Sequence, residues 1–357
     1  MMILQGSRCL KCINPINFPG ITFSDNGICS FCIDGIGVPL ERKGLSTKLK
    51  SAKKIIVALS GGRDSCYGLH YLSQNTSAEI IAFTYDWPLV NQRARRNASR
   101  MVSALEIEHV LRVPDSFKHL KFIRKIVNAI SKKPDPNVIP LLLAPDKFFF
   151  YEASRVAIRY KADAIVFCAG NDLEFTSFKS GVAGAKSTKT NEMLQLSKFQ
   201  SIKLLFALGF SYLRNPRLFL AGIGIPLSAY LQTYFVRPKV EYLFQQITWD
   251  EIEIEKTLEE YNWEGPEVSS LNRWRSGDGT SDFYNYLYFK LLGFDERTAN
   301  LANRVRAGLI SREKALEMDL MNKTPDLKAL QEYASVVGFQ LDEFLRRFNR
   351  HLPPEQV

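Results

Sequence analysis

The chain has 357 residues, of which 46% are hydrophobic and 24% are charged, so its composition excludes an intrinsically disordered chain. Because a single core stops growing below this length, we expect one main domain with smaller modules. Residues 1–250 carry 33 basic and 18 acidic side chains, whereas residues 251–357 carry 14 and 19. A basic excess of this kind attracts nucleic acid, anionic membranes or phosphorylated small molecules, and charge alone does not choose among them.

The start of the chain lacks the basic residues and apolar stretch of a secretory signal. Six cysteines in a chain this long are too few for a disulfide scaffold. We therefore expect a cytoplasmic protein. The most apolar region, 204–236, is interrupted by Arg214, Pro216, Arg217 and Pro226, so it is interpreted as a buried or surface-lying helical hairpin rather than a transmembrane span.

Four of the cysteines form two pairs, Cys9-x-x-Cys12 and Cys29-x-x-Cys32, separated by sixteen residues. Such pairs supply four thiolates to a tetrahedral Zn²⁺ ion in a segment too small to fold on its own core. We expect a zinc ribbon with a structural role, because catalytic zinc keeps an open coordination position.

Short apolar runs alternate with helical stretches after a basic linker. We expect strands over 55–59, 79–85, 109–113 and 164–168, and helices over 66–72, 92–105, 117–130 and 146–160. This alternation predicts a doubly wound parallel α/β sheet with right-handed crossovers. Beyond residue 170 the pattern ends, and the Ser-, Lys-, Thr- and Gly-rich stretch 176–198 predicts a mobile loop and a candidate lid. We expect further helices over 312–318, 324–338 and 342–350.

The segment between the first strand and its helix reads Ser60-Gly61-Gly62-Arg63-Asp64-Ser65. Two glycines let the backbone turn tightly and bring N–H groups up to an anion, and the helix N-terminus adds its positive dipole end. Open α/β sheets bind ligands at this edge. The segment does not match G-x-x-x-x-G-K-[ST], so it is not an ordinary P-loop.

This segment resembles the S-G-G-x-D-S loop of the N-type ATP pyrophosphatase (PP-loop) superfamily, which has an adenine nucleotide alpha hydrolase-like fold. The superfamily includes the synthetase domains of asparagine and GMP synthetases and several tRNA-thiolating enzymes. The resemblance implies that ATP is cleaved between its α and β phosphates in the presence of Mg²⁺. AMP is then transferred to a carbonyl or amide oxygen, which becomes a leaving group.

Within that superfamily the chain resembles the N-acetyl sugar amidotransferase family of lipopolysaccharide O-antigen and pseudaminic or legionaminic acid biosynthesis. The matching segments are the paired cysteines, the loop, Gly170-Asn171-Asp172-Leu173-Glu174, Trp249-Asp250 and 307–315. The family implies conversion of the acetamido group of a nucleotide-linked N-acetyl sugar to an acetamidino group. Ammonia is expected from a separate class I glutaminase subunit.

The resemblance also implies a set of site residues. Asp64 is expected to hold Mg²⁺ or orient the loop, and Glu174 to hold Mg²⁺ or accept a proton from ammonia, with a solvated loop acid as the alternative for Glu174. Arg63 stands where the family often has Lys. The positive charge is kept, but the compact ammonium group of Lys is replaced by a planar guanidinium group with several N–H donors. The expected ATP and pyrophosphate contacts are Ser60, Gly61, Gly62, Arg63, Asp64, Ser65, Phe83, Thr84, Gly170 and Asn171, with strand-end packing as the alternative for Phe83 and Thr84.

Two other functions stay open. A tRNA sulfur transferase would use the same adenylation step and carry persulfide on Cys66 and Cys168, which are otherwise inert core thiols. A zinc-ribbon protein that binds nucleic acid without catalysis is the second alternative. No aromatic residues interleave the basic run 93–100, so nucleic acid is not the expected partner.

We predict four regions from these patterns. They are a four-Cys zinc ribbon over 1–45, a PP-loop ATP pyrophosphatase domain over 50–175, a mobile loop with an apolar helical insertion over 176–245, and an acidic C-terminal helical region over 246–357.

Overall fold

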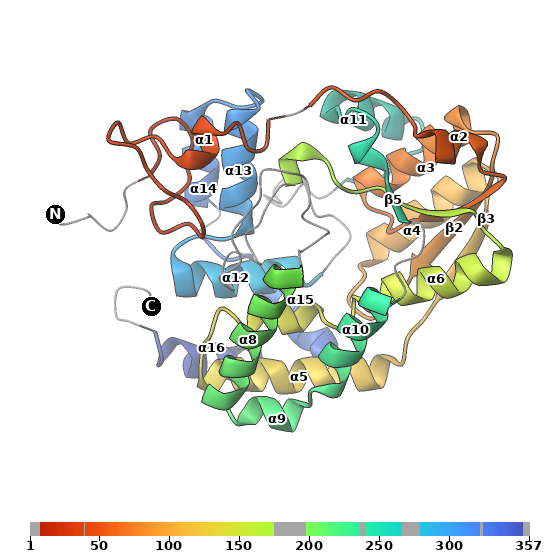
Figure 1. Cartoon of the computed structure of the whole chain (residues 1–357). Helices are drawn as coiled ribbons and strands as arrows, with labels where there is room; N and C mark the ends of the chain where they lie inside the picture. Colours follow the sequence, from red (N-terminus) through yellow and green to blue (C-terminus); the bar gives the residue numbers. More distant parts are fainter. Residues whose placement is uncertain are drawn as a thin grey trace.

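A five-stranded parallel sheet lies at one end of the molecule (Figure 1), in a computed structural model that describes residues 8–38, 40–174, 198–235, 240–265, 279–321 and 324–352. The strand order is β3-β2-β1-β4-β5. The strands are β1 (Lys54–Ala58), β2 (Glu79–Tyr85), β3 (Glu108–Arg112), β4 (Ala164–Phe167) and β5 (Val240–Tyr242). The expected fold class, a doubly wound parallel α/β sheet, is confirmed.

The two central strands are buried on both faces. β1 pairs with β2 and β4, so that Ile55 lies opposite Ile80 on one side and Ala164 on the other. Successive side chains of a strand point to opposite faces, and accordingly Ile56 lies in one hydrophobic cluster and Ile55 in the other. Both faces therefore need covering helices, which explains the continuous apolar run in the sequence.

The helices of the α/β region follow the predicted order. They are α2 (Thr47–Ser51), α3 (Arg63–Asn75), α4 (Gln92–Ala104), α5 (Ser116–Lys132) and α6 (Phe148–Tyr160), with the 3₁₀ turn η1 (Ile139–Leu143) in the Pro-rich stretch. Asn91 caps α4 by accepting a hydrogen bond from the N–H of Ala94, and Asp115 caps α5 through Lys118. The four predicted strands and the helices over 92–105, 117–130 and 146–160 are confirmed, whereas β5 was not predicted.

The C-terminal helices pack around α5 and against the sheet region. They are α11 (Glu251–Glu259), α12 (Ser281–Leu292), α13 (Glu296–Arg306), α14 (Arg312–Met321), α15 (Leu327–Val337) and α16 (Leu341–Asn349). α15 and α16 contact α5, whereas α11 lies on α3. Tyr284 and Tyr288 of α12 are fully buried. The predicted C-terminal helices are confirmed, and the region boundary at 246 stays a prediction.

The N-terminal segment packs on the far end of the chain. Its short helix α1 (Ser30–Ile33) lies beside α13 and α14 (Figure 1). The guanidinium of Arg8 lies 2.7 Å from Asp319 of α14, and the rings of Phe18 and Phe294 are 5.4 Å apart. The segment that holds the four paired cysteines therefore joins the C-terminal helices rather than the sheet.

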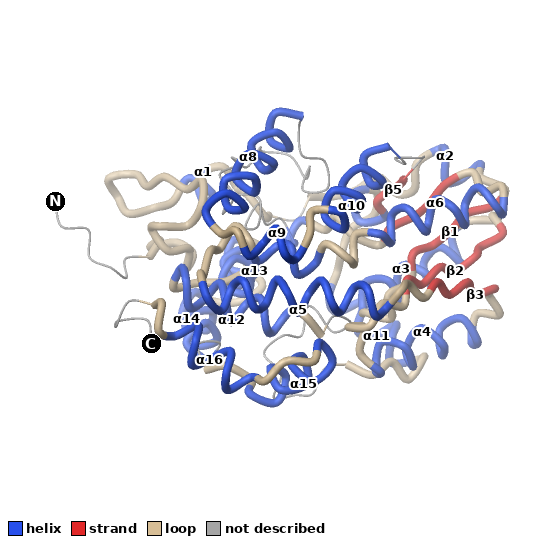
Figure 2. Tube along the Cα trace, turned by 90° about the horizontal axis from the view of Figure 1, so that it is seen from below, coloured by secondary structure: helices blue, strands red, loops and turns tan. Residues whose placement is uncertain are grey.

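The apolar region forms three helices, α8 (Lys198–Arg214), α9 (Arg217–Ala221) and α10 (Gly224–Phe235). They lie together along α5 on one side of the molecule (Figures 1 and 2), with Tyr212 and Leu218 buried beneath them. Among the described residues no helix is long and apolar enough to cross a membrane. The predicted mobile loop and candidate lid lie outside the described residues, apart from Lys198 at the start of α8.

Candidate functional site

The Ser60–Ser65 loop connects the end of β1 to α3. β1 lies between β2 and β4, and the chain leaves β1 in one direction toward β2 and β3 and returns on the other side as β4. The strand order reverses at this point, where open α/β sheets form their ligand crevice. The loop and the segment after β4 therefore lie at the edge of the sheet where a ligand is expected.

Gly61 fixes the path of the loop. It has a φ of +76°, and a Cβ added to it would lie 1.9 Å from the carbonyl oxygen of Ala94, so no other residue fits. The carbonyl of Gly61 accepts hydrogen bonds from Asn97 Nδ2 at 3.3 Å and from Trp263 Nε1 at 3.2 Å. The start of α4 and the segment after α11 thus hold this carbonyl in place.

The two loop serines brace each other. Their Oγ atoms are 3.0 Å apart, and the N–H of Ser60 donates to Ser65 Oγ at 3.1 Å. Gly62 is the N-cap of α3 and has no side chain to accept from the first-turn N–H groups. The first turn of α3 therefore offers N–H donors and a positive dipole end to an anion, as the sequence predicted.

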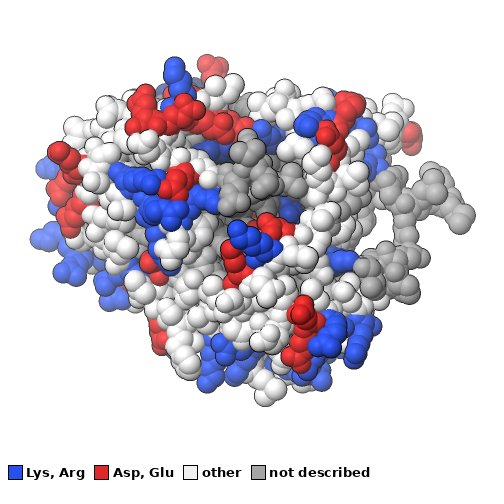
Figure 3. Space-filling view, turned by 180° about the vertical axis from the view of Figure 1, so that it is seen from behind, with Lys and Arg blue, Asp and Glu red and all other residues white. Residues whose placement is uncertain are grey.

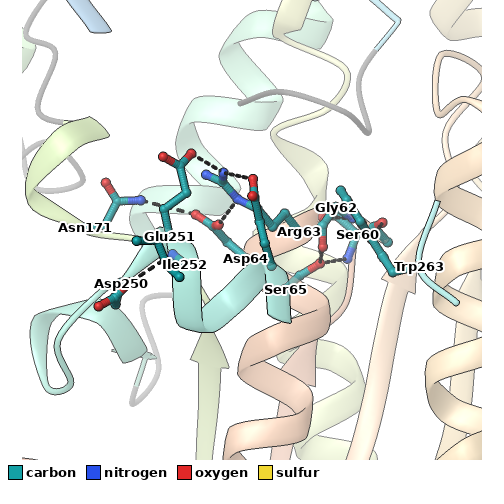
Figure 4. Close-up of polar contacts among 12 residues, drawn as sticks. Ser60, Gly62, Arg63, Asp64, Ser65, Asn171, Asp250, Glu251, Ile252 and Trp263 are labelled. Carbon is teal, nitrogen blue, oxygen red and sulfur yellow. Dashed lines mark hydrogen bonds and ion pairs between the residues drawn. The ribbon is translucent and has the colours of Figure 1, made fainter. Parts of the chain in front are cut away.

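Arg63 does not point into open solvent. Its side chain is 8% exposed, with Nη1 2.6 Å from Glu251 Oε1 and Nε 3.1 Å from Asp64 Oδ1 (Figure 4). The guanidinium also stacks on Trp249, 4.9 Å from the ring centroid. Burial lowers the pKa of Arg63, but the charges of Asp64 and Glu251 outweigh it and raise that pKa. The predicted phosphate contact of Arg63 is untested, and in this structure its partners are carboxylates.

Asp64 links the loop to the segment after β4. Its Oδ2 accepts a hydrogen bond from Asn171 Nδ2 at 3.2 Å (Figure 4). Gly170 has a φ of +89°, which turns the chain out of β4 and places Asn171 beside the loop. The structure thus brings together two of the sequence segments that were predicted to share a site.

Glu251 is a site residue that the sequence interpretation missed. It lies at the start of α11, and its carboxylate bridges Arg63 and the guanidinium of Arg304, whose Nη1 and Nη2 lie 3.0 and 2.6 Å from its two oxygens. Burial raises the pKa of Glu251, but the hydrogen bonds and charges of Arg304 and Arg63 outweigh it and lower that pKa. The only sequence signal was its place in the first turn after the capping residue Asp250.

Phe83 and Thr84 are placed less favourably for a ligand contact than the loop residues, and the side chain of Glu174 is not described. The ring of Phe83 is buried in the core. The hydroxyl of Thr84 already donates to the carbonyl of Leu59 at 2.6 Å and lies 2.8 Å from His109 Nε2. These positions agree with strand-end packing, and adenine contacts there stay a prediction. The backbone of Glu174 ends the 3₁₀ turn η2 (Asp172–Glu174), whereas its side chain lies outside the described part of the structure.

Cys66 and Cys168 lie close to the loop; Cys66 is buried and Cys168 is half-buried. Cys66 is fully buried in a hydrophobic cluster, and Cys168 lies against α3, where a Cβ on Gly68 would come within 2.2 Å of its sulfur. Burial raises the pKa of both thiols. Because the thiolate is the reactive form, these cysteines fit inert core thiols better than persulfide carriers.

The four paired cysteines form one compact cluster. Their sulfurs all lie within 4.8 Å of one another, with Cys9 and Cys32 3.8 Å apart and Cys12 and Cys29 3.7 Å apart. Four sulfurs around one ion, with metal–sulfur bonds of about 2.3 Å, are separated by about 3.8 Å. The cluster therefore fits one tetrahedral metal ion. A four-iron cluster would separate the sulfurs further, because each sulfur binds a different iron.

Positive charge reaches this cluster from α13. Arg306 Nη1 donates to Cys12 Sγ at 3.3 Å, and the N–H groups of Cys12 and Cys29 donate to Cys9 Sγ at 3.4 and 3.3 Å. Hydrogen bonds from Cys29 and Cys32 lower the pKa of Cys12, which favours its thiolate. The thiolate is the form that binds a metal ion, and hydrogen bonds to the sulfurs support such a site.

The basic run on α4 is largely paired with acids. Arg95 lies 2.7 Å from Asp86, and Arg96 and Arg100 lie 2.5 and 2.6 Å from Glu264. Ion pairs of this kind reduce the positive charge left for phosphates. The expectation that nucleic acid is not the partner stays a prediction.

No protein-family model and no curated protein matches the chain. Among solved structures, it is similar to the NMN synthetase of Francisella tularensis, at 15% identity and a TM-score of 0.25, covering 44% of this chain and 63% of that one. It is also similar to the U34-tRNA thiolase NcsA of Methanococcus maripaludis, which has a 4Fe-4S cluster, at 16% identity and a TM-score of 0.29, covering 64% and 86%. The chain thus spans less than two thirds of the synthetase, and the fold class rests on its own strand order and register.

Proposed function

We propose that the chain is an ATP-dependent amidotransferase of the PP-loop type that forms AMP and pyrophosphate. The observation that carries the proposal is the glycine-fixed loop at the reversal of the strand order, with Asp64 held by Asn171 from the end of β4. The loop offers N–H donors to the β and γ phosphates, and the sequence resemblance supplies the reaction class.

The proposed substrate is a nucleotide-linked N-acetyl sugar of surface polysaccharide biosynthesis. Its acetamido oxygen attacks the α phosphorus of ATP, the bond to the bridging oxygen breaks, and pyrophosphate leaves toward the loop. Ammonia then adds to the activated carbon, loses a proton, and expels AMP as the C–O bond breaks. The products are an acetamidino sugar, AMP and pyrophosphate, and a class I glutaminase subunit is the proposed ammonia source.

The chain's own residues have three roles in this proposal. The N–H groups at the start of α3 hold the departing pyrophosphate, and Ser60 and Ser65 brace the loop. Asp64 provides the carboxylate for Mg²⁺, which supplies charge neutralisation at the phosphates when it is bound. Glu174 is the proposed proton acceptor or second magnesium ligand.

We further propose that the cysteine cluster holds Zn²⁺ in a structural role. Four buried sulfurs leave no position open for a substrate. The cluster packs on α13 through Arg306, and α13 also carries Arg304, which binds Glu251. The ion would therefore stabilise α13, whose Arg304 binds the same carboxylate as Arg63 of the loop. We place the enzyme in the cytoplasm, where nucleotide sugars are made.

The products of ATP test the proposal most directly. The purified chain, given ATP, Mg²⁺, ammonia and a panel of UDP-, GDP- and CMP-linked N-acetyl sugars, is expected to release AMP and pyrophosphate only when its sugar is present. Release of ADP and phosphate would contradict the reading of the loop. Release of AMP that depends on tRNA and a sulfur donor, rather than on a sugar, would favour the thiolase instead.

A further inference from the structure

The helices α8, α9 and α10 present large apolar side chains to solvent. The apolar hairpin face is defined by six exposed residues, Phe206, Phe210, Leu213, Leu220, Leu227 and Leu231. Phe206, Leu213 and Leu220 are 75%, 74% and 71% exposed. Single exposed apolar residues are ordinary, but six large ones on three successive helices make this side of the molecule a candidate interaction site.

The helical spacing places these residues on common sides of their helices. Phe206, Phe210 and Leu213 follow one another at i, i+4 and i+7 along α8, and Leu227 and Leu231 are four residues apart on α10. The polar and small residues Ser211, Asn215 and Ala229 are buried on the opposite side. Tyr212 and Leu218 are buried as well, so these helices carry large apolar side chains on both sides, and the outward ones are in excess of those that the core uses.

Contacts with α5 hold the hairpin in this orientation. Asn215 Nδ2 donates to the carbonyl of Ala129 at 3.3 Å. Lys125 Nζ donates to the carbonyl of Leu220, and Lys133 Nζ to that of Arg214, each at 2.6 Å. The two lysines thus bind the C-terminal ends of α9 and α8, where cations are favoured. Figure 2 shows the three helices lying over α5 on one side of the molecule.

The segment that carries this face is basic in sequence, and Asp135 lies beside α8, where it accepts a hydrogen bond from Ser211 Oγ at 2.7 Å. Residues 193–240 contain six Lys and Arg and no Asp or Glu. Arg214 lies over the ring of Phe210, 5.0 Å from its centroid, and Arg214 and Arg217 are both exposed at the turn between α8 and α9. The face seen in Figure 3, from the opposite side, instead mixes acidic and basic side chains.

We propose that the apolar hairpin face binds the interfacial region of an anionic phospholipid bilayer. The apolar side chains would enter the boundary between headgroups and acyl chains, and Arg214 and Arg217 would meet lipid phosphates. A second copy of the chain fits less well, because residues 193–240 contain no Asp or Glu and a symmetric contact through them would offer Arg214 and Arg217 no acidic partner from this segment. The proposal does not depend on the reaction that the enzyme catalyses.

Vesicle co-sedimentation tests the proposal. The full chain is mixed with phosphatidylcholine vesicles, with or without about one-third phosphatidylglycerol, at low and high salt. We expect binding to the anionic vesicles, at least about tenfold weaker binding to the neutral ones, and further weakening in high salt. The triple variant Phe206→Ser, Phe210→Ser, Leu213→Ser should lose vesicle binding, and Arg214→Glu with Arg217→Glu should lose the preference for anionic lipid.

A matched variant controls for the loss of exposed apolar area. Phe117, Ile158 and Leu320 are also exposed but lie on α5, α6 and α14, and changing all three to Ser should leave vesicle binding intact. Failure of the unmodified chain to bind anionic vesicles, or undiminished binding by the hairpin triple variant, would overturn the proposal. It would also be overturned if the chain were a dimer that the triple variant converts to a monomer, since the face would then belong to a second copy.

Discussion

Glu251 and Arg304 form a two-point contact, with Arg304 Nη1 and Nη2 3.0 and 2.6 Å from the two carboxylate oxygens. The same carboxylate accepts from Arg63 in the loop at 2.6 Å. A single acid at the start of α11 thus ties the first turn of α3 to α13. Because two guanidinium groups converge on it, the carboxylate must be ionised for the three elements to stay together.

Removing this charge should destabilise the protein. Glu251→Gln removes the carboxylate that Arg63 and Arg304 share and leaves Arg63 its longer contacts with Asp64 and Glu255. We expect the free energy of unfolding to fall by about 2 kcal/mol, less than for a fully buried pair. Denaturant unfolding at neutral pH measures it. Glu255→Gln is the matched control on the same helix, because Glu255 is 53% exposed and 3.8 Å from Arg63. A Glu251→Gln variant as stable as this control would contradict the role given to the contact.

The same carboxylate predicts a pH dependence. The folded state lowers the pKa of Glu251 below its ordinary value of 4.5, so its stabilising contribution is complete above about pH 4.5 and is lost as the pH falls through the lowered value. Thermal unfolding from pH 6 to pH 3 should therefore show a smaller loss of stability for Glu251→Gln than for the unmodified protein. Parallel curves for the two proteins would argue against this assignment.

The loop glycine gives a second prediction. Gly61→Ala forces its Cβ against the carbonyl of Ala94 at 1.9 Å, so the loop must move and AMP formation should fall by at least about a hundredfold. Gly293→Ala is the control, because Gly293 has a φ of +80° but nothing within 4 Å of its Cβ position. The control should lose only about 1–2 kcal/mol of stability, from backbone strain. Equal activity of the two variants would show that the close approach to α4 is unimportant.

Asp64 is the carboxylate that we propose as the magnesium ligand. Asp64→Asn removes its charge and should lower turnover at saturating ATP by about a hundredfold, with a higher Mg²⁺ requirement. Initial rates of pyrophosphate release at several Mg²⁺ concentrations check this. The control, Asp86→Asn, changes an acid after β2 that is bound to Arg95 and should leave the magnesium dependence unchanged. A matching magnesium profile for Asp64→Asn and the unmodified chain would remove Asp64 from this role.

Replacing Cys66 and Cys168 separates the two proposed enzyme classes. The double change to Ala should leave sugar-dependent AMP formation within about threefold of the unmodified rate, because burial raises the pKa of both thiols and disfavours the reactive thiolate. A sulfur transferase would lose its activity completely. Circular dichroism of the double variant distinguishes loss of chemistry from loss of folding.

The cysteine cluster predicts about one bound metal ion per chain, measurable by plasma mass spectrometry. Cys9→Ser should lower that content, and a chelator should cause the N-terminal segment to become sensitive to protease. Cys168→Ala should change neither result. A folded, protease-resistant chain without metal would contradict the proposed structural zinc.

The sequence predicted the parts whose signal is local. The apolar run of β1, the two glycines after it and the C-x-x-C pairs each follow from chemistry within a few neighbouring residues, and the structure places them as expected. The three-residue β5 was missed because it is short and includes Glu241. It pairs with β4, whose partner residue Ile165 lies 75 residues before Val240.

The contacts of Arg63 could not be predicted from its neighbours in the sequence either, because its partner Glu251 lies far away along the chain. The sequence indicates a cation in a phosphate loop, but not that an acid 188 residues later accepts from it at 2.6 Å. The spacing of Arg304 and Arg306 on α13 likewise does not indicate that Arg304 binds a carboxylate and Arg306 a cysteine sulfur. Long-range ion pairs depend on the packing of helices, which one sequence does not specify.

The contact between Arg8 and Asp319 joins residues 311 positions apart. The helices α13 and α14, on which the N-terminal segment docks, follow it in the sequence only after the whole of the sheet. This interface can therefore form only after β1 to β5 have been translated. Until then the segment with the paired cysteines has, among its described residues, no helix of its own to pack on except the four residues of α1.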